Sequence, residues 1–217
     1  MEKVIEYIYN LNKNQSKLEE RYNFIINYNP IGFIPAVRYE VALLLNIIAS
    51  IKRPKDVLDI GFGSGASSIF IKDGCNDNSN IISLERDKNR FLRGEKLLEH
   101  LNISMLNIIN DTALAFFENN KIKFDFVFLD SAKNEYVNLL PIIKNNLSKE
   151  GLLIVDNTLF NNKVVEDIEK IEKRHKNIVS TLKEFNHILS NDNDFKTIFL
   201  SIGDGVSISI LMVTNQL

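Results

Sequence analysis

The sequence has little of what stabilises a secreted or membrane-embedded protein. Its 217 residues contain a single cysteine, Cys75, so no disulfide can form within the chain, which favours a reducing compartment. The first residues include Glu2 and Lys3 and lack the apolar stretch of a signal peptide. The longest apolar run, residues 41–51, is interrupted by polar residues and is too short to span a bilayer. We therefore expect a cytoplasmic protein that does not enter the membrane.

Signatures of several enzyme classes are also absent. The sequence has no G-x-S-x-G and no H-E-x-x-H motif, which argues against a serine hydrolase or a zinc protease of those types. Its three histidines have no spacing typical of metal ligands or of a catalytic triad. The formal net charge of -2 means that nucleic-acid binding would need a local basic patch. The composition that remains, 45% hydrophobic and 25% charged, is ordinary for a globular domain.

Residues 57–65 predict a nucleotide-type binding site. Residues 57–60 predict a buried strand, and Gly61, Gly63 and Gly65 follow at alternate positions before a predicted helix. Glycine accepts positive φ and lets a ligand approach the backbone, and the free N–H groups of a helix start point toward that ligand. The spacing, without a following Lys-Ser or Lys-Thr, makes a poor phosphate cradle, and a simple tight turn is the alternative.

Apolar strands and helical stretches alternate over residues 53–217. The alternation indicates an α/β fold with a mostly parallel sheet and helices on both faces. Gly203-Asp204-Gly205 predicts a hairpin, so the last two strands should run antiparallel to each other. Residues 161–189 predict one long charged helix. Strands are expected at residues 57–60, 81–85, 105–109, 124–130, 152–156, 197–202 and 206–213, with helices at 67–72, 87–100, 112–119 and 136–147.

Residues 1–52 predict a helical cap in front of this core, within one domain that covers residues 1–217. A break is expected at Asn29-Pro30, followed by a loop over residues 31–35. Packing, a dimer contact and a lid over the site are the alternative roles of this cap. Its helices are expected at residues 4–11, 18–26 and 38–51, where apolar residues recur at helical spacing.

Acidic residues follow the carboxyl ends of the predicted strands, where open α/β sheets bind their ligands. Glu85 comes about 20 residues after the glycine turn, the place of a ribose-binding carboxylate in such folds. Any one of these acids alone also fits a helix N-cap or a turn. Together they indicate a site built from Asp59, Glu85, Asp111, Asp130, Asp156 and Asn157.

Two of these strand ends predict a metal site and a catalytic base. Asp130, Asp156 and Asn157 offer the hard oxygen ligands that Mg²⁺ or Mn²⁺ accepts. Lys133 follows Asp130 by three residues, and a lysine beside a divalent cation has a lowered pKa, which would let it act as a base. A solvated surface lysine is the alternative.

Several segments resemble one enzyme family. Residues 57–65 resemble motif I of class I S-adenosylmethionine-dependent methyltransferases. Residues 130–136 resemble the D-x-x-K-x-x-Y segment of the metal-dependent catechol and caffeoyl-CoA O-methyltransferases, and Asp156-Asn157 matches their D-N pair. Residues 110–114 are similar to their G-D-A-L segment. Within the family, the bacterial tRNA 5-hydroxyuridine O-methyltransferases are the group we find most similar, on residues 156–160, 165–167, 184–187 and 203–209.

The resemblance implies a Rossmann-like class I methyltransferase fold with a seven-stranded, mostly parallel sheet and S-adenosylmethionine as cofactor. Glu85 would accept hydrogen bonds from the ribose hydroxyls, and Asp111 would lie near the adenine. Mg²⁺ or Mn²⁺ would be held by Asp130, Asp156 and Asn157. The implied cofactor contacts are Asp59, Gly61, Gly63, Ser67, Glu85, Asp111 and Asp130, and the implied catalytic residues are Lys133 and Asp130.

Motif I departs from the family pattern at three positions. Asp59 stands where the family often has Glu, Gly63 lies inside the motif, and Ala66 replaces the usual Tyr. These differences imply that the methionine end of the cofactor is held differently in this chain.

The chemistry leaves three functions open. The first two are metal-dependent O-methylation of 5-hydroxyuridine in tRNA and of a small catechol-like molecule, since each substrate has two adjacent oxygens that can chelate an ion. The third is a nucleotide-binding protein or dehydrogenase that uses the same glycine turn. This third function does not explain Asp156-Asn157 or Lys133.

A tRNA substrate needs a basic surface, and the charged stretch after the metal-ligand candidates offers one. Its cations are interleaved with the acids of residues 166–172, so a solvated helix face is the alternative. The resemblance also implies a homodimer. The cations are Lys163, Lys170, Lys173, Arg174 and Lys176, with Arg38 expected near the mouth of the site.

Overall fold

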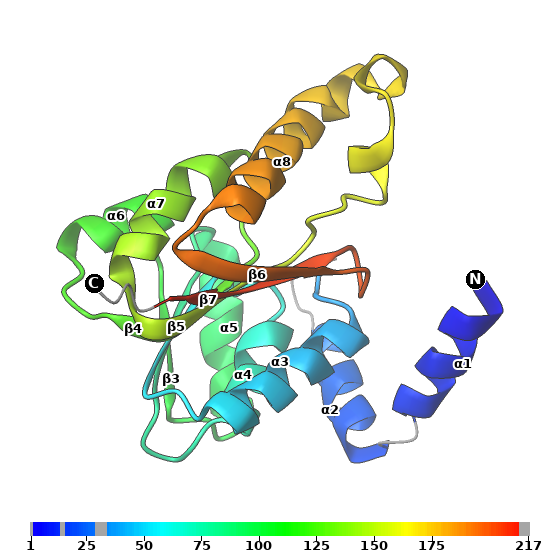
Figure 1. Ribbon diagram of the computed structural model, residues 1–217. Coiled ribbons are helices and arrows are strands. Elements are labelled where there is room, and N and C mark those ends of the chain that lie inside the picture. Colours follow the sequence, from blue (N-terminus) through cyan, green and yellow to red (C-terminus); the bar gives the residue numbers. More distant parts are fainter. Residues whose placement is uncertain (1, 14–15, 29–33, 213–217) are drawn as a thin grey trace.

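The fold is built on a seven-stranded sheet with the strand order β3-β2-β1-β4-β5-β7-β6 (Figure 1). The computed structural model describes residues 2–13, 16–28 and 34–212. The five strands from β3 to β5 pair in parallel, and β7 runs antiparallel to both of its neighbours, β5 and β6. The strands are β1 (Asp56–Ile60), β2 (Asn80–Leu84), β3 (Leu106–Ile109), β4 (Phe124–Leu129), β5 (Leu147–Val155), β6 (Phe195–Leu200) and β7 (Val206–Leu211).

Helices cover both faces of the sheet, as the alternation in the sequence predicts (Figure 1). Val57 of β1 and Phe126 of β4 face the layer that contains α3, α4 and α5, while Leu58 and Val127 face the layer of α6, α7 and α8. Successive side chains of a strand point to opposite faces of the sheet, so helices on both faces bury the central strands completely. The helices are α3 (Tyr39–Lys52), α4 (Ala66–Gly74), α5 (Lys88–His100), α6 (Ala113–Asn119), α7 (Tyr136–Asn146) and α8 (Lys173–Asn191).

Two further helices precede this core, α1 (Glu2–Lys13) and α2 (Ser16–Asn27). α2 packs on the α3–α5 layer, where Ile25 is fully buried. α1 stands away from the body, and its apolar residues Val4, Tyr7, Ile8 and Leu11 are exposed (Figure 1). The expected homodimer stays a prediction, and most of the loop expected over residues 31–35 lies outside the described residues.

The predicted helix over residues 161–189 is wrong over residues 161–172. α8 begins only at Lys173, and two short 3-10 turns, Lys163–Val165 and Ile168–Lys170, precede it. At the predicted start of the helix, three residues have positive φ: Phe160, Asn161 and Asn162, at 47, 52 and 62°. Residues in this left-handed region cannot belong to a right-handed helix. We call residues 160–172 the arm.

The start of β5 also differs from the prediction of residue 152. The strand begins at Leu147, and its register against β4 shifts between Phe124 and Phe126. The early part of β5 is polar and irregular, with Glu150 at a φ of 57°, so it lacks the apolar signal of a buried strand. None of the helices in the described ranges is long and apolar enough to cross a membrane.

We expect Gly94→Ala to destabilise the protein, although alanine is normally the better helix residue. Gly94 lies inside α5, and an added Cβ would come within 2.7 Å of both Phe62 Cε1 and Ile108 Cδ1. Overpacking of this kind costs about 1–3 kcal/mol in the free energy of unfolding, measurable by urea denaturation. The double variant Phe62→Leu/Gly94→Ala should lose less than the sum of the two single variants. A Gly94→Ala protein as stable as the parent would contradict this packing account.

Candidate active site

A cavity of about 280 Å³ lies at the carboxyl ends of β1, β2 and β4. The glycine turn after β1 forms one wall, and Pro35, Ala36 and Val37, in the segment that leads into α3, contribute another. Of the residues expected to contact a cofactor, all but one line this cavity: Gly61, Gly63, Ser67, Glu85, Asp111 and Asp130. The structure therefore brings together residues that are far apart in the sequence, together with Lys133.

Glycine is required at the start of the turn by the neighbouring strand. Gly61 has a φ of 117°, and an added Cβ would lie 2.1 Å from the backbone oxygen of Asp130. The end of β4 is held this close because the Asp130 N–H donates to the Ile60 carbonyl at 3.0 Å. Gly63 also has a positive φ, 52°. The two glycines thus let the turn pass beside β4 while its backbone stays open to the cavity.

Glu85 is fixed in the wall by backbone hydrogen bonds. Its Oε2 accepts from the Gly63 N–H at 3.0 Å, and its Oε1 accepts from the Asp87 N–H at 2.9 Å. Only 5% of the residue is exposed. Each carboxylate oxygen has a second lone pair that remains for a ligand hydroxyl. Glu85 is therefore preorganised as an acceptor for vicinal hydroxyl groups.

Asp59 lies behind the cavity rather than in its wall, which corrects the expected direct contact. It is fully buried, and its Oδ2 accepts hydrogen bonds from the hydroxyls of Ser67 and Ser68, with Ser83 at 3.4 Å. Burial raises the pKa of Asp59 to about 7, against the lowering effect of the serine hydroxyls. Asp59 acts on the site through Ser67, which lines the cavity in the first turn of α4.

The proposed metal ligands lie at the ends of two paired strands. β4 and β5 run parallel with Leu129 opposite Val155, so Asp130 and Asp156 follow in the same register. The Asp156 N–H donates to the Leu129 carbonyl at 3.1 Å, which fixes the two ends side by side. Burial, and then the nearby charge of Asp130, raise the pKa of Asp156 to about 7, while Lys133 acts in the opposite direction.

The donor atoms at these strand ends fit Mg²⁺ or Mn²⁺. Among the described residues, no group of three or more His, Cys, Asp and Glu side chains is placed to hold a metal. The candidate set is instead two carboxylates and the Asn157 amide, all oxygen donors of the type that these hard ions accept. Two buried hydroxyls beside it, Ser131 Oγ and Thr158 Oγ1, have no hydrogen-bond partner in the described part of the chain. Buried polar atoms normally have a hydrogen-bond partner, so these two hydroxyls are open to a bond from a polar ligand or water.

Lys133 lines the cavity and forms an ion pair with one member of this oxygen set, Asp130. Its Nζ is 2.7 Å from Asp130 Oδ1, and about one fifth of each side chain is exposed. Lys133 opens a short 3-10 helix, Lys133–Glu135, that leads into α7. The ion pair holds the amine at the wall of the cavity.

Arg93 is a residue of the site that the sequence does not reveal. Only 2% of it is exposed, and it donates to the carbonyls of Ser64, in the glycine turn, and of Ile25 and Tyr28, at the end of α2. Burial lowers its pKa. The carbonyls at a helix C-terminus carry partial negative charge and offset the buried cation. In the sequence Arg93 is one of several charged residues of a helix, with no signal of this role.

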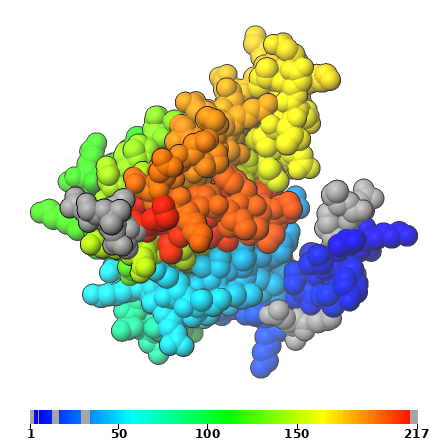
Figure 2. Space-filling model, in the orientation of Figure 1, coloured from blue at the N-terminus to red at the C-terminus, as the bar shows by residue number. Residues whose placement is uncertain are grey.

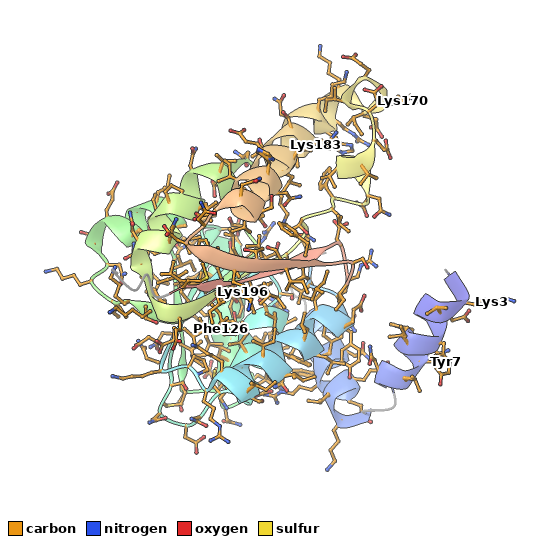
Figure 3. The ribbon with its side chains drawn as sticks, in the orientation of Figure 1. Lys3, Tyr7, Phe126, Lys170, Lys183 and Lys196 are labelled. Atoms are coloured by element: carbon orange, nitrogen blue, oxygen red, sulfur yellow. The ribbon has the colours of Figure 1, made fainter. Side chains whose placement is uncertain are left out.

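The basic residues of the charged stretch are largely paired. Arg174 forms an ion pair with Glu172 at 2.8 Å and Lys176 with Glu169 at 3.6 Å, while Lys163 Nζ lies 2.7 Å from His175 Nδ1. The arm and the first half of α8 extend beyond the body of the molecule (Figure 2). Figure 3 shows Lys170 at the tip of the arm and Lys183 part-way along α8. This surface is therefore mixed in charge rather than uniformly positive.

Several known proteins are similar to this chain. A family model described as O-methyltransferase matches residues 17–212. The chain belongs to this O-methyltransferase family. A provisionally named caffeoyl-CoA O-methyltransferase from Arabidopsis thaliana is 26% identical over 168 residues, which cover 76% of this chain and 72% of the relative.

Solved structures agree with the fold of this O-methyltransferase. A provisionally named caffeoyl-CoA O-methyltransferase from Staphylococcus aureus has a TM-score of 0.82 at 26% identity, over 95% of this chain and 98% of that one. The O-methyltransferase from Bacillus cereus in complex with SAH has a TM-score of 0.77 at 19% identity, over 90% of both chains. The class I methyltransferase fold expected from the sequence is confirmed.

The buried carboxyl of Asp59 predicts a specific dependence of stability on pH. Because its pKa rises from 3.8 to about 7 on folding, the stabilisation that it contributes is complete below its unfolded pKa and is lost as the pH rises through about 7. Asp59→Asn should remove this loss, on the order of 2–4 kcal/mol, leaving a flatter profile. Urea unfolding of both metal-free proteins at several pH values measures this pH dependence of the free energy of unfolding. Asp156 is present in both proteins, so its contribution is common to the two profiles. Equal slopes for the two proteins would rule out a protonated Asp59.

Proposed function

We propose that the protein is an S-adenosylmethionine- and divalent-metal-dependent O-methyltransferase for a hydroxyl that neighbours a second oxygen, with 5-hydroxyuridine in tRNA as its substrate. The observation that carries the catalytic part is the juxtaposition of two features. The cavity that holds the preorganised carboxylate of Glu85 is also lined by Asp130 and Lys133, which form an ion pair, and Asp156 and Asn157 follow the strand paired with that of Asp130. A nucleotide-binding protein without group transfer would need only the first feature.

The residues divide the work of binding between cofactor and acceptor. Glu85 accepts hydrogen bonds from the ribose hydroxyls of the cofactor, and the backbone of Gly61 and Gly63 forms the surface against which it lies. S-adenosylmethionine supplies a methyl group on a positively charged sulfur. Asp111 lines the same cavity as Glu85 and would contact the adenine. Methyl transfer is an in-line displacement, so fixed positions of donor and acceptor are the main requirement.

On the acceptor side, Asp130, Asp156 and Asn157 would hold the divalent ion. The ion supplies Lewis acidity, which lowers the pKa of a bound hydroxyl and orients it. Lys133, whose Nζ lies 2.7 Å from Asp130 Oδ1, would be the group that accepts the proton of that hydroxyl. Asp130 bonds to Lys133 and therefore orients the base as well as the ion.

The choice of tRNA rests on resemblance and on part of the arm. The stretches at residues 156–160, 184–187 and 203–209 resemble the tRNA 5-hydroxyuridine group, and hydrogen bonds from Thr158 to Gly205 and from Asn186 to Thr158 join them. Lys170 and Lys173 of this region form no ion pair with any described residue, which leaves them available to phosphates. A small catechol-like acceptor is the second candidate, because relatives named for caffeoyl-CoA share the family.

Methyl transfer from labelled S-adenosylmethionine to two acceptors tests the function. We expect label in tRNA that carries 5-hydroxyuridine and loss of that label with EDTA. tRNA that lacks the 5-hydroxyl is the matched control and should stay unlabelled. Label only in a simple catechol would move the substrate to small molecules and keep the catalyst. Transfer that EDTA leaves intact would refute the metal part of the proposal.

Replacement of the base should affect turnover more than binding. Lys133→Ala is expected to lower kcat about a hundredfold or more, with the acceptor KM changed little, because the lost group acts on the proton in the transition state. Steady-state kinetics with the preferred acceptor measure both constants. At higher pH the variant should recover part of its rate, since hydroxide then removes the proton. A pure increase in KM would assign Lys133 to binding instead.

A further inference from the structure

The backbone that follows the metal-ligand candidates has an unusual conformation. Phe160, Asn161 and Asn162 are three successive non-glycine residues in the left-handed region, and Asn157 has a φ of 59°. Such residues are uncommon singly, and each costs free energy relative to the right-handed form. They persist where surrounding contacts hold them, often at functional sites. We call residues 157–162 the strap.

The tip of the β6–β7 hairpin holds the strap. The Thr158 N–H donates to the Gly205 carbonyl at 3.0 Å, and the Leu159 N–H donates to the Asp204 carbonyl at 2.9 Å. The Asn161 N–H donates to the carboxylate Oδ1 of Asp204 at 2.5 Å. The hydrogen bonds of the hairpin thus continue onto the strap and end at the middle of its left-handed turn.

The hairpin tip is packed tightly against the strap. An added Cβ at Gly205 would lie 2.4 Å from Leu159 Cγ and 2.6 Å from Thr158 Oγ1. From the other side, the Asn186 side chain on α8 donates to the Thr158 carbonyl at 2.8 Å. The first half of the strap is therefore clamped by backbone bonds and packing, whereas the left-handed turn receives its side-chain bond from Asp204.

We propose that Asp204 is a positioning residue for the acceptor side of the site. Its carboxylate offsets the cost of the left-handed turn, and with the backbone bonds of the hairpin it completes the hold on the segment that leads from Asn157 into the arm. This role rests on the proposed function, because Asn157 is there a ligand of the divalent ion. Positioning residues around a metal typically change its affinity by 10–100-fold when they are removed.

Three variants separate positioning from simple stabilisation of the hairpin. Asp204→Ala removes the bond to Asn161, and Asp204→Asn keeps a neutral oxygen acceptor at the same place. Asp167→Ala is the matched control, since Asp167 Oδ1 accepts the Glu169 N–H at 3.1 Å outside the strap. Direct Mn²⁺ titration, followed by electron paramagnetic resonance, should show about tenfold weaker binding for Asp204→Ala. We expect Asp204→Asn to lie in between, Asp167→Ala to match the parent, and SAH affinity to stay within about twofold.

A second-site change tests the backbone argument itself. Glycine adopts positive φ without the penalty of a Cβ, so Asn161→Gly added to Asp204→Ala should recover most of the lost Mn²⁺ affinity. Absence of this rescue, or Mn²⁺ affinity unchanged in Asp204→Ala, would overturn the proposal. An equal loss of SAH affinity would also overturn it, because a general loss of structure would then explain the effect.

Amide hydrogen exchange of the metal-free protein keeps this test independent of the proposed function. Asp204→Ala should accelerate exchange at Thr158–Asn161 at least tenfold and leave the glycine turn, residues 61–65, unchanged. If the parent protein binds no Mn²⁺, the metal-dependent function fails, while faster exchange confined to the strap still supports the positioning role. Exchange unchanged in the strap would contradict that role.

Discussion

Two carboxylates at neighbouring strand ends, Asp130 and Asp156, set the electrostatic condition for the whole site. The parallel register of β4 and β5 forces them together, and Asp156 is almost fully buried. Like charges in such a place are unstable unless protons or cations offset them. Lys133 offsets one of the two, at 2.7 Å from Asp130. A divalent ion would offset the remainder, and a positively charged sulfonium in the adjoining cavity would be favoured by the same field.

The supports of the site come from separate parts of the fold: helix α5, strand β1 and the β6–β7 hairpin. Arg93 links the end of α2 to the glycine turn, Asp59 holds the first turn of α4 through Ser67, and Asp204 holds the strap after β5. Arg93 and Asp59 bond to the cavity residues Ser64 and Ser67, and Asp204 bonds to Asn161 in the strap. The N-terminal helix α2 is thus joined to the wall of the cofactor cavity rather than being a separate appendage. The first helix, α1, differs from α2 because it presents apolar side chains to solvent.

The sequence predicts the order of strands and helices well because a short apolar run and a helical spacing of apolar residues are different patterns. The direction of β7 also follows, since Gly203-Asp204-Gly205 marks a hairpin, and the last two strands are confirmed as antiparallel. The long helix from residue 161 fails because its left-handed start depends on contacts with a hairpin more than 40 residues away. Local propensity does not report such contacts.

In the candidate site, too, local sequence patterns predict some residues, whereas long-range contacts decide others. Glu85, Asp111 and Asp130 are found in the cavity wall because their positions at strand ends follow from the sheet alone. Asp59 has the same sequence signal, yet it faces serines of α4, and only the packed structure distinguishes the two orientations. Arg93 lacks any local signal, since its partners are backbone carbonyls whose identity the sequence does not encode.

The central claim is that an oxygen-ligated divalent ion occupies the junction of β4 and β5 beside the cofactor cavity. A crystal structure of the protein grown with Mn²⁺ and SAH, with anomalous scattering data at the manganese edge, tests this most directly. The account predicts one anomalous peak coordinated by Asp130, Asp156 and Asn157, with SAH against the glycine turn and Glu85. SAH in place with no manganese between these three side chains, or manganese bound elsewhere, would contradict it.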